Sequence, residues 1–289
     1  MTLTLKALKR LDETPPWDWP EDTATDLLDV LRDPRAGEEQ RVLAAELAGN
    51  SVVINDELAH ALLALLRSAE QPDAVRSTAA ISLGPVLESC DTDGFDDPDF
   101  VAIGEDTFRE IGETMRSLHL DTGVSKEVRR RILEASVRAP VEWHVEAIRS
   151  TCASDDREWK LTGIFCTRFV RGFDEEILAS LDTADHDIHA AAVVAAGTWE
   201  IEAVWPHVLG LITAPDPDRR LLLAAIGAVG ELRPQEAAVI LADLADSDDP
   251  EIAEAVLEAS SLADYGWNEN EDEEDDDDLD EDDEPGSLH

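Results

Sequence analysis

The chain has 289 residues, of which 67 are acidic and 23 basic, and its formal net charge is −44. The three cysteines, Cys90, Cys152 and Cys166, are too few for a disulfide framework, and an odd number cannot all pair. No apolar run approaches the 18 residues of a membrane-spanning helix, and the first residues lack the apolar core of a signal peptide. These features exclude a secreted disulfide-rich protein or an integral membrane protein, and we expect a cytoplasmic one.

The acidity extends over the whole chain. Residues 269–284 hold 14 of the acidic side chains, so 53 acidic and 23 basic residues remain elsewhere, a charge near −30. In dilute salt such a body repels itself, whereas in molar salt the Debye length falls to about 3 Å and the repulsion is screened. We therefore predict a protein from a halophilic archaeon that lives with a salt-filled cytoplasm. The alternative is an acidic protein that mimics or chaperones a polyanion partner.

Apolar residues recur at helical spacing through most of the chain, which predicts an all-α fold. The pattern divides into seven consecutive helix pairs. The first helices of the pairs are expected to begin near Thr23, Asp56, Glu105, Val141, Phe173, Ile201 and Pro234. The second helices are expected to begin near Ala36, Pro72, Ser125, Asp155, Asp185, Asp216 and Asp248. Asp–Pro and Pro–Asp steps between the helices of a pair supply turn and capping chemistry.

The second helices also repeat one another. Each of four segments has an alanine five residues before a glycine, at Ala44–Gly49, Ala79–Gly84, Ala192–Gly197 and Ala225–Gly230. Periods of 20–50 residues are typical of solenoids, in which each unit buries its apolar face against its neighbours. The small residues are expected to let adjacent backbones approach closely.

The second helices resemble those of HEAT-like repeats, in particular the short phycobilisome-lyase type. The best match is residues 72–84, PDAVRSTAAISLG, and Arg41 and Arg129 keep the arginine of the pattern. The resemblance covers residues 21–265 and implies a right-handed α-solenoid. It further implies that Asp73, Arg76 and Arg41 belong to a structural ladder between adjacent repeats.

Three segments fall outside the regular pattern. Residues 1–20 are expected to cap the open end of the solenoid, with Trp17 and Trp19 covering its core. Residues 90–104 lengthen the link between the second and third pairs as an insertion loop. Residues 266–289 are an acidic tail with almost no apolar content, which predicts disorder and leaves open that the tail docks back onto the chain.

Signatures of catalysis are scarce. No phosphate-binding loop, His-Glu-x-x-His helix or Gly-x-Ser-x-Gly elbow occurs, and the His-Glu dipeptides of HEAT-like di-iron hydroxylases are missing. His186 and His189 are weak candidates for a metal site, because two ligands at i, i+3 lack a visible third. We expect no metal, no cofactor and no enzymatic activity.

The charge distribution offers the clearest functional hint. Residues 109–171 hold 12 of the basic side chains and ten acidic ones, so this window is the least acidic part of the chain. Either the arginines pair internally along a ladder, or they form a stripe that docks an acidic partner. For the second reading the candidate partner-binding residues are Arg129, Arg130, Arg131, Trp143, Trp159, Lys160 and Arg168.

Together these patterns predict a scaffold or adaptor that binds another protein along the concave face of its solenoid. The alternative is nucleic-acid binding, as in HEAT-like DNA glycosylases, with Trp143, Trp159, Trp199 and Trp205 lining a groove. The overall charge disfavours that alternative, because nucleic-acid affinity depends on basic side chains that neutralise phosphates.

Overall fold

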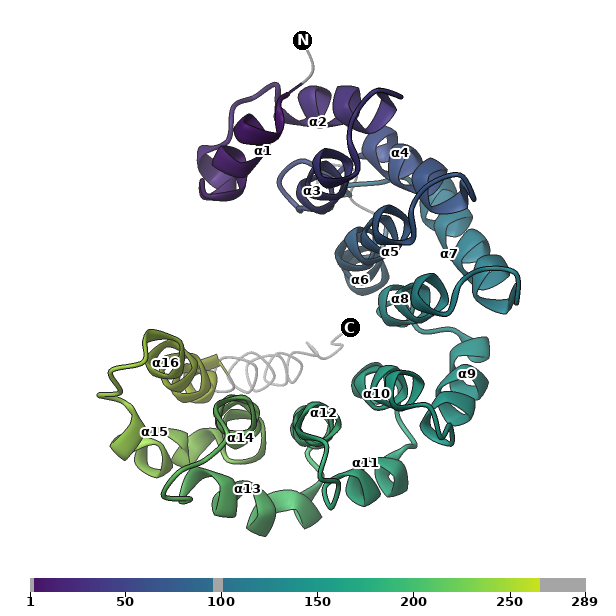
Figure 1. Cartoon of the computed structure of the whole chain (residues 1–289). Helices are drawn as coiled ribbons and strands as arrows, with labels where there is room; N and C mark the ends of the chain where they lie inside the picture. The colour runs from purple at the N-terminus through teal and green to yellow at the C-terminus, as the bar shows by residue number, and fades with distance from the viewer. Residues whose placement is uncertain (1–2, 96–100, 266–289) are drawn as a thin grey trace, which may run out of the picture. The chain divides into compact units, whose positions relative to one another are not determined.

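A computed structural model describes residues 3–95 and 101–265, and all regular structure in these ranges is helical (Figure 1). The chain divides into two compact units, Met1–Phe173 and Asp174–His289. The predicted tail, its possible self-docking and part of the predicted loop fall outside the described residues. In the described part, no helix has the length and apolar character needed to cross a membrane.

The first unit is built from helix pairs that stack in two layers. One layer holds the first helix of each pair: α2 (Thr23–Arg32), α4 (Asp56–Arg67), α7 (Glu105–Leu120) and α9 (Glu142–Cys152). The other holds the second helices: α3 (Glu38–Ala48), α5 (Asp73–Ser82), α8 (Lys126–Ser136) and α10 (Arg157–Cys166). The unit ends in a short 3-10 helix, η2 (Thr167–Phe169).

The second unit also consists of helix pairs. Its first helices are α11 (Asp174–Ser180), α13 (Trp205–Ile212, preceded by η3, Glu202–Val204) and the broken segment of η4 (Pro234–Glu236), α15 (Ala237–Ile240) and η5 (Ala242–Leu244). Its second helices are α12 (His186–Thr198), α14 (Arg219–Leu232) and α16 (Pro250–Tyr265), which pack on one another in sequence. The prediction of an all-α fold with seven consecutive helix pairs is confirmed, and the starts of the observed helices lie close to the expected ones.

Two helices were not anticipated. α1 (Leu5–Asp12) packs against α3 and buries Leu8, and η1 (Pro16–Asp18) follows it. α6 (Gly84–Asp93) continues from α5 beyond a break at Leu83, where Pro85 cannot supply a backbone donor, and it occupies the start of the predicted loop. Of the two tryptophans expected to cover the core, Trp19 packs against it and donates its indole N–H to backbone carbonyls, whereas Trp17 is 78% exposed.

The small residues of the second helices allow close packing, as the repeats suggested. A Cβ atom on Gly49 would lie 2.3 Å from the backbone oxygen of Ser82, and one on Gly197 would lie 3.0 Å from the Cα of Ala228. The stack therefore depends on glycine where neighbouring second helices touch.

Aspartates fix the starts of several second helices. Asp156 accepts backbone N–H groups of Glu158 and Trp159 at the start of α10, and Asp218 does the same at the start of α14. Such caps satisfy donors that have no partner inside the helix. Asp73 differs, because it is the first residue of α5 itself, is exposed, and makes no hydrogen bond or ion pair among the described residues.

Candidate functional site

Polar contacts between residues about one repeat apart recur in both units. The two partners of each contact are separated by 30 to 33 residues, and most of these contacts join neighbouring helix pairs. In the first unit the pairs are Lys9–Glu39 (2.7 Å), Arg41–Gln71 (2.8 Å), Lys126–Asp156 (3.0 Å) and Arg130–Thr162 (3.0 Å). In the second unit they are His186–Asp218 (3.0 Å), Asp187–Arg220, Glu202–Arg233 (2.8 Å) and Arg219–Asp249 (2.6 Å).

The three residues that the family resemblance assigns to a ladder differ in their contacts. Arg41 donates to Gln71 of the next repeat and to two carbonyls in its own turn, whereas Arg76 donates to the Leu66 carbonyl inside its own repeat. Asp73 joins neither.

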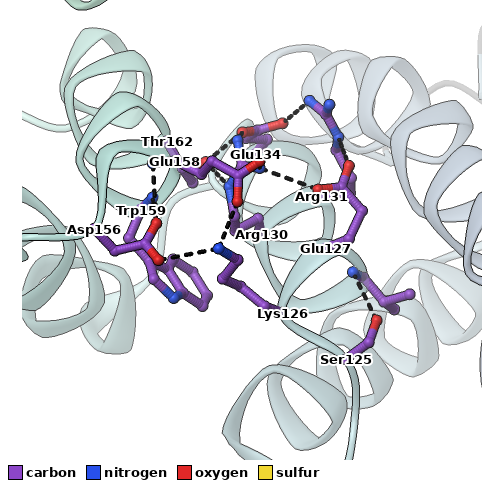
Figure 2. A network of polar contacts seen from close by, with 11 residues as sticks. Ser125, Lys126, Glu127, Arg130, Arg131, Glu134, Asp156, Glu158, Trp159 and Thr162 are labelled. Atoms are coloured by element: carbon purple, nitrogen blue, oxygen red, sulfur yellow. Dashed lines mark hydrogen bonds and ion pairs between the residues drawn. The ribbon is translucent and has the colours of Figure 1, made fainter.

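The arginines of the basic window contribute to a network between α8 and α10 (Figure 2). Arg130 is 4% exposed, donates to the Thr162 hydroxyl and forms an ion pair with Glu127 at 3.0 Å. The Thr162 hydroxyl in turn donates to the buried carboxylate of Glu134 at 2.5 Å. Arg131 bonds both Glu127 and Glu134, at 2.9 and 2.7 Å. Arg130 thus serves the contact between two repeats, whereas Arg131 pairs with carboxylates of its own helix, α8.

The other residues proposed for partner binding are spread over the same two repeats. Arg129 donates to the His119 carbonyl, and its guanidinium lies 5.4 Å from the ring centre of Trp159. The Arg168 guanidinium lies 5.1 Å from the ring centre of Phe169. Lys160 is exposed, and its side chain makes no hydrogen bond or ion pair among the described residues. The structure brings Trp143 and Trp159 together, because both contact the ring of His119.

Trp143 also lines a groove that sequence reasoning missed. In the first layer α2 packs on α4 and α4 on α7, but within the described residues α7 and α9 scarcely touch. A hollow of about 820 Å³ lies between them. Its apolar lining residues are Leu87, Phe95, Phe108, Gly112, Ala139, Val141 and Trp143. A hollow of this size and composition is typical of binding sites.

The indole ring of Trp143 is held by its neighbours. It stacks on the ring of His144 at a centroid distance of 3.9 Å and meets His119 at 5.3 Å. His144 is 1% exposed, and its Nδ1 accepts the backbone N–H of Val141 at 3.0 Å. Because Nδ1 is the acceptor, Nε2 carries the hydrogen and donates to the Ser136 hydroxyl at 3.0 Å. Burial lowers the pKa of His144 to about 4, so the ring is neutral at pH 7.

This hydrogen-bond pattern bears on chemistry as well as structure. A histidine that activates a serine must accept the hydroxyl proton on the nitrogen that faces it. Here that nitrogen is already protonated, so Ser136 and His144 are not arranged as a nucleophile and its base. The groove presents a binding surface with a fixed aromatic wall.

The weak metal candidates of the second unit have different hydrogen-bond partners. His186 bonds Asp218, whereas the Nε2 atoms of His189 and His207 face each other at 2.6 Å. Burial, followed by the neighbouring His207 and His186, lowers the pKa of His189. In the described ranges no group of three or more histidine, cysteine, aspartate or glutamate side chains is placed to hold a metal ion.

Comparisons with known proteins provide little beyond this geometry. No protein-family model and no curated protein matches the sequence. Similar solved structures include YibA of Escherichia coli, with 15% identity over 90% of this chain and 93% of that one and a TM-score of 0.44. Human deoxyhypusine hydroxylase in complex with glycerol matches at 16% identity over 91% and 92%, with a TM-score of 0.39. An engineered protein matches at 18% identity over 72% and 97%, also at 0.39. At these identities and scores the matches carry no argument about function.

Proposed function

We propose that this protein is a non-enzymatic scaffold that binds another protein in a high-salt cytoplasm. The observation that carries the proposal is the groove between α7 and α9, an apolar hollow of about 820 Å³ with Trp143 fixed in its wall. Tryptophan in a desolvated pocket is the residue type that most often dominates the energy of a protein interface. Because its neighbours hold the ring in place, little side-chain entropy is lost on binding.

The proposal places the partner at the groove rather than on the arginine stripe. Arg130 and Arg131 are already paired with carboxylates of α8, so a partner would have to compete with Glu127 and Glu134 for them. Arg129 is bound to a backbone carbonyl. Of the candidate residues named from the sequence, Trp143 faces an open hollow.

The test is affinity capture from an extract of the source organism in about 2–3 M KCl, where surface charges are screened. The full chain is compared with Gly112→Leu, which adds a side chain in the wall of the groove, and with Gly227→Leu, a matched change at an open position in α14. We expect one stoichiometric protein that is retained by the wild type and the α14 variant and lost with the groove variant. Recovery of nucleic acid alone, or of the same protein with all three, would contradict the proposal.

A further inference from the structure

One side of α7 lines the groove along about three helical turns. Glu105, Arg109, Gly112 and Arg116 line the hollow at helical spacing, and Phe108 and Glu113 lie beside them. From residue 105 to residue 116 a helix rises about 16 Å, or three turns. The groove is therefore long enough to receive a short helix lying along α7.

Gly112 stands at the middle of this stripe. Glycine inside a helix costs about 1 kcal/mol relative to alanine. A Cβ atom at this position would meet no atom within 4 Å outside its own helix, so internal packing does not require the glycine. Its effect is to deepen the hollow where another backbone can approach α7 closely.

Carboxylates without partners stand on both walls. Among the described residues, Glu105 and Glu113 on α7 and Glu142 on α9 make no hydrogen bond or ion pair. Arg109 on the same rim is already paired with Asp106. Arg116, at the far end of the stripe, has no partner in the described part of the chain, and it suits the negative carbonyl end of a helix.

We infer that the groove receives a helix of about three turns from a partner protein, with an apolar face against Trp143 and Phe108 and basic side chains over Glu113 and Glu142. This inference rests on the proposed function and names its ligand. Such a helix lies in the gap between α7 and α9. The apolar face supplies the contact energy, and the basic flanks remove the unpaired carboxylates.

The test uses a displayed library of peptides of about 14 residues. The library is selected on the full chain and counter-selected on Gly112→Leu, at the lowest KCl concentration at which circular dichroism shows the folded state. We expect enriched sequences with apolar residues at i, i+3, i+4 and i+7 and with lysine or arginine on both flanks. A synthetic copy should gain helical signal on binding.

Charge reversal then separates the groove from the general acidity of the surface. The double variant Glu113→Lys with Glu142→Lys should weaken the synthetic peptide at least about tenfold. The control pair, Glu57→Lys with Glu175→Lys, makes the same charge change at exposed positions on α4 and α11 and should leave affinity unchanged.

Three outcomes overturn the inference. In the first, the enriched peptides are acidic or gain no helical signal when they bind. In the second, both charge-reversed pairs weaken binding equally. In the third, no selected peptide loses binding to Gly112→Leu. The first leaves the scaffold proposal standing, because groove-dependent binding remains. The capture experiment tests the scaffold proposal itself.

Discussion

The hydroxyl of Thr162 on α10 is bound to the buried carboxylate of Glu134 on α8, at 2.5 Å. The same oxygen accepts the Arg130 Nε–H at 3.0 Å, so one small side chain satisfies both members of a buried charged pair across two repeats. Breaking one element of a buried polar network costs more than the net value of a single hydrogen bond, because its partners stay desolvated.

Thr162→Val should therefore lower the free energy of unfolding by about 1–3 kcal/mol. The shape of the side chain is kept, but Glu134 loses a donor and Arg130 an acceptor. Urea denaturation at fixed salt measures the change, with Thr162→Ser as the control that restores the hydroxyl. Equal loss in both variants would mean that packing, and not the hydroxyl, matters at this position.

Substitution of the arginines separates internal from external roles. Arg130→Ala leaves Glu134 buried with one ion-pair partner fewer, and we expect a loss of about 3–5 kcal/mol of stability. Lys160→Ala, at an exposed residue of the same repeat pair, should change stability by less than about 0.5 kcal/mol. The double variant Arg129→Glu with Arg130→Glu should unfold the first unit. If it abolished partner binding with unchanged thermal stability, the arginine stripe would be the docking surface instead.

The two kinds of glycine should respond in opposite directions. Gly49→Ala places a Cβ atom 2.3 Å from the Ser82 backbone oxygen, and separating α3 from α5 should cost about 1–3 kcal/mol. Gly112→Ala meets open space in mid-helix and should raise stability by about 0.5–1 kcal/mol. Thermal unfolding of the two variants beside the wild type checks both signs.

His144 predicts a pH dependence of stability. Burial holds its pKa in the folded chain at about 4, below the value of about 6.5 in the unfolded chain. The unfolded state therefore takes up the proton first as the pH falls. This contribution is fully present above about pH 6.5 and is lost progressively down to pH 4, with a total of about 3 kcal/mol. His144→Asn should flatten the profile between these limits, whereas an unchanged profile would assign the effect to other groups.

The net charge of −44 predicts a requirement for salt. Like charges spread over both units repel one another in dilute buffer, and molar KCl screens them. The melting temperature should rise steeply with KCl up to about 1 M and continue upward more slowly. A melting temperature that is flat or falling with KCl would remove the support for a halophilic origin.

The periodicity of the sequence is sufficient to predict the helix pairs but not the groove between α7 and α9. The starts of helices can be recognised from their capping residues. The sequence predicts a helix starting near Ser125, and α8 begins at Lys126 with Ser125 as its cap. The helix α6 was missed because it follows α5 across Leu83 with hardly a break, so no turn signal marks its start. The groove depends on α7 and α9 standing apart, a relation between residues some 30 positions distant that no local pattern records.

The arginines show a different limit. Arg129, Arg130 and Arg131 are adjacent in the sequence, yet consecutive residues of a helix point about 100° apart. Arg130 consequently points toward α10 and bonds Thr162, whereas Arg129 bonds the His119 carbonyl. Grouping charges by their position along the chain overlooks this rotation.

The one-repeat spacing of the polar contacts has a consequence for how such a chain can change in length. Lys126 finds its acceptor Asp156, and Arg219 its acceptor Asp249, about one repeat further along. The partners differ from one junction to the next, because Arg41 meets a glutamine and Arg130 a threonine. A duplicated or deleted repeat would therefore keep the spacing of these contacts but bring unmatched side chains together, so the order of the repeats is written into their polar contacts.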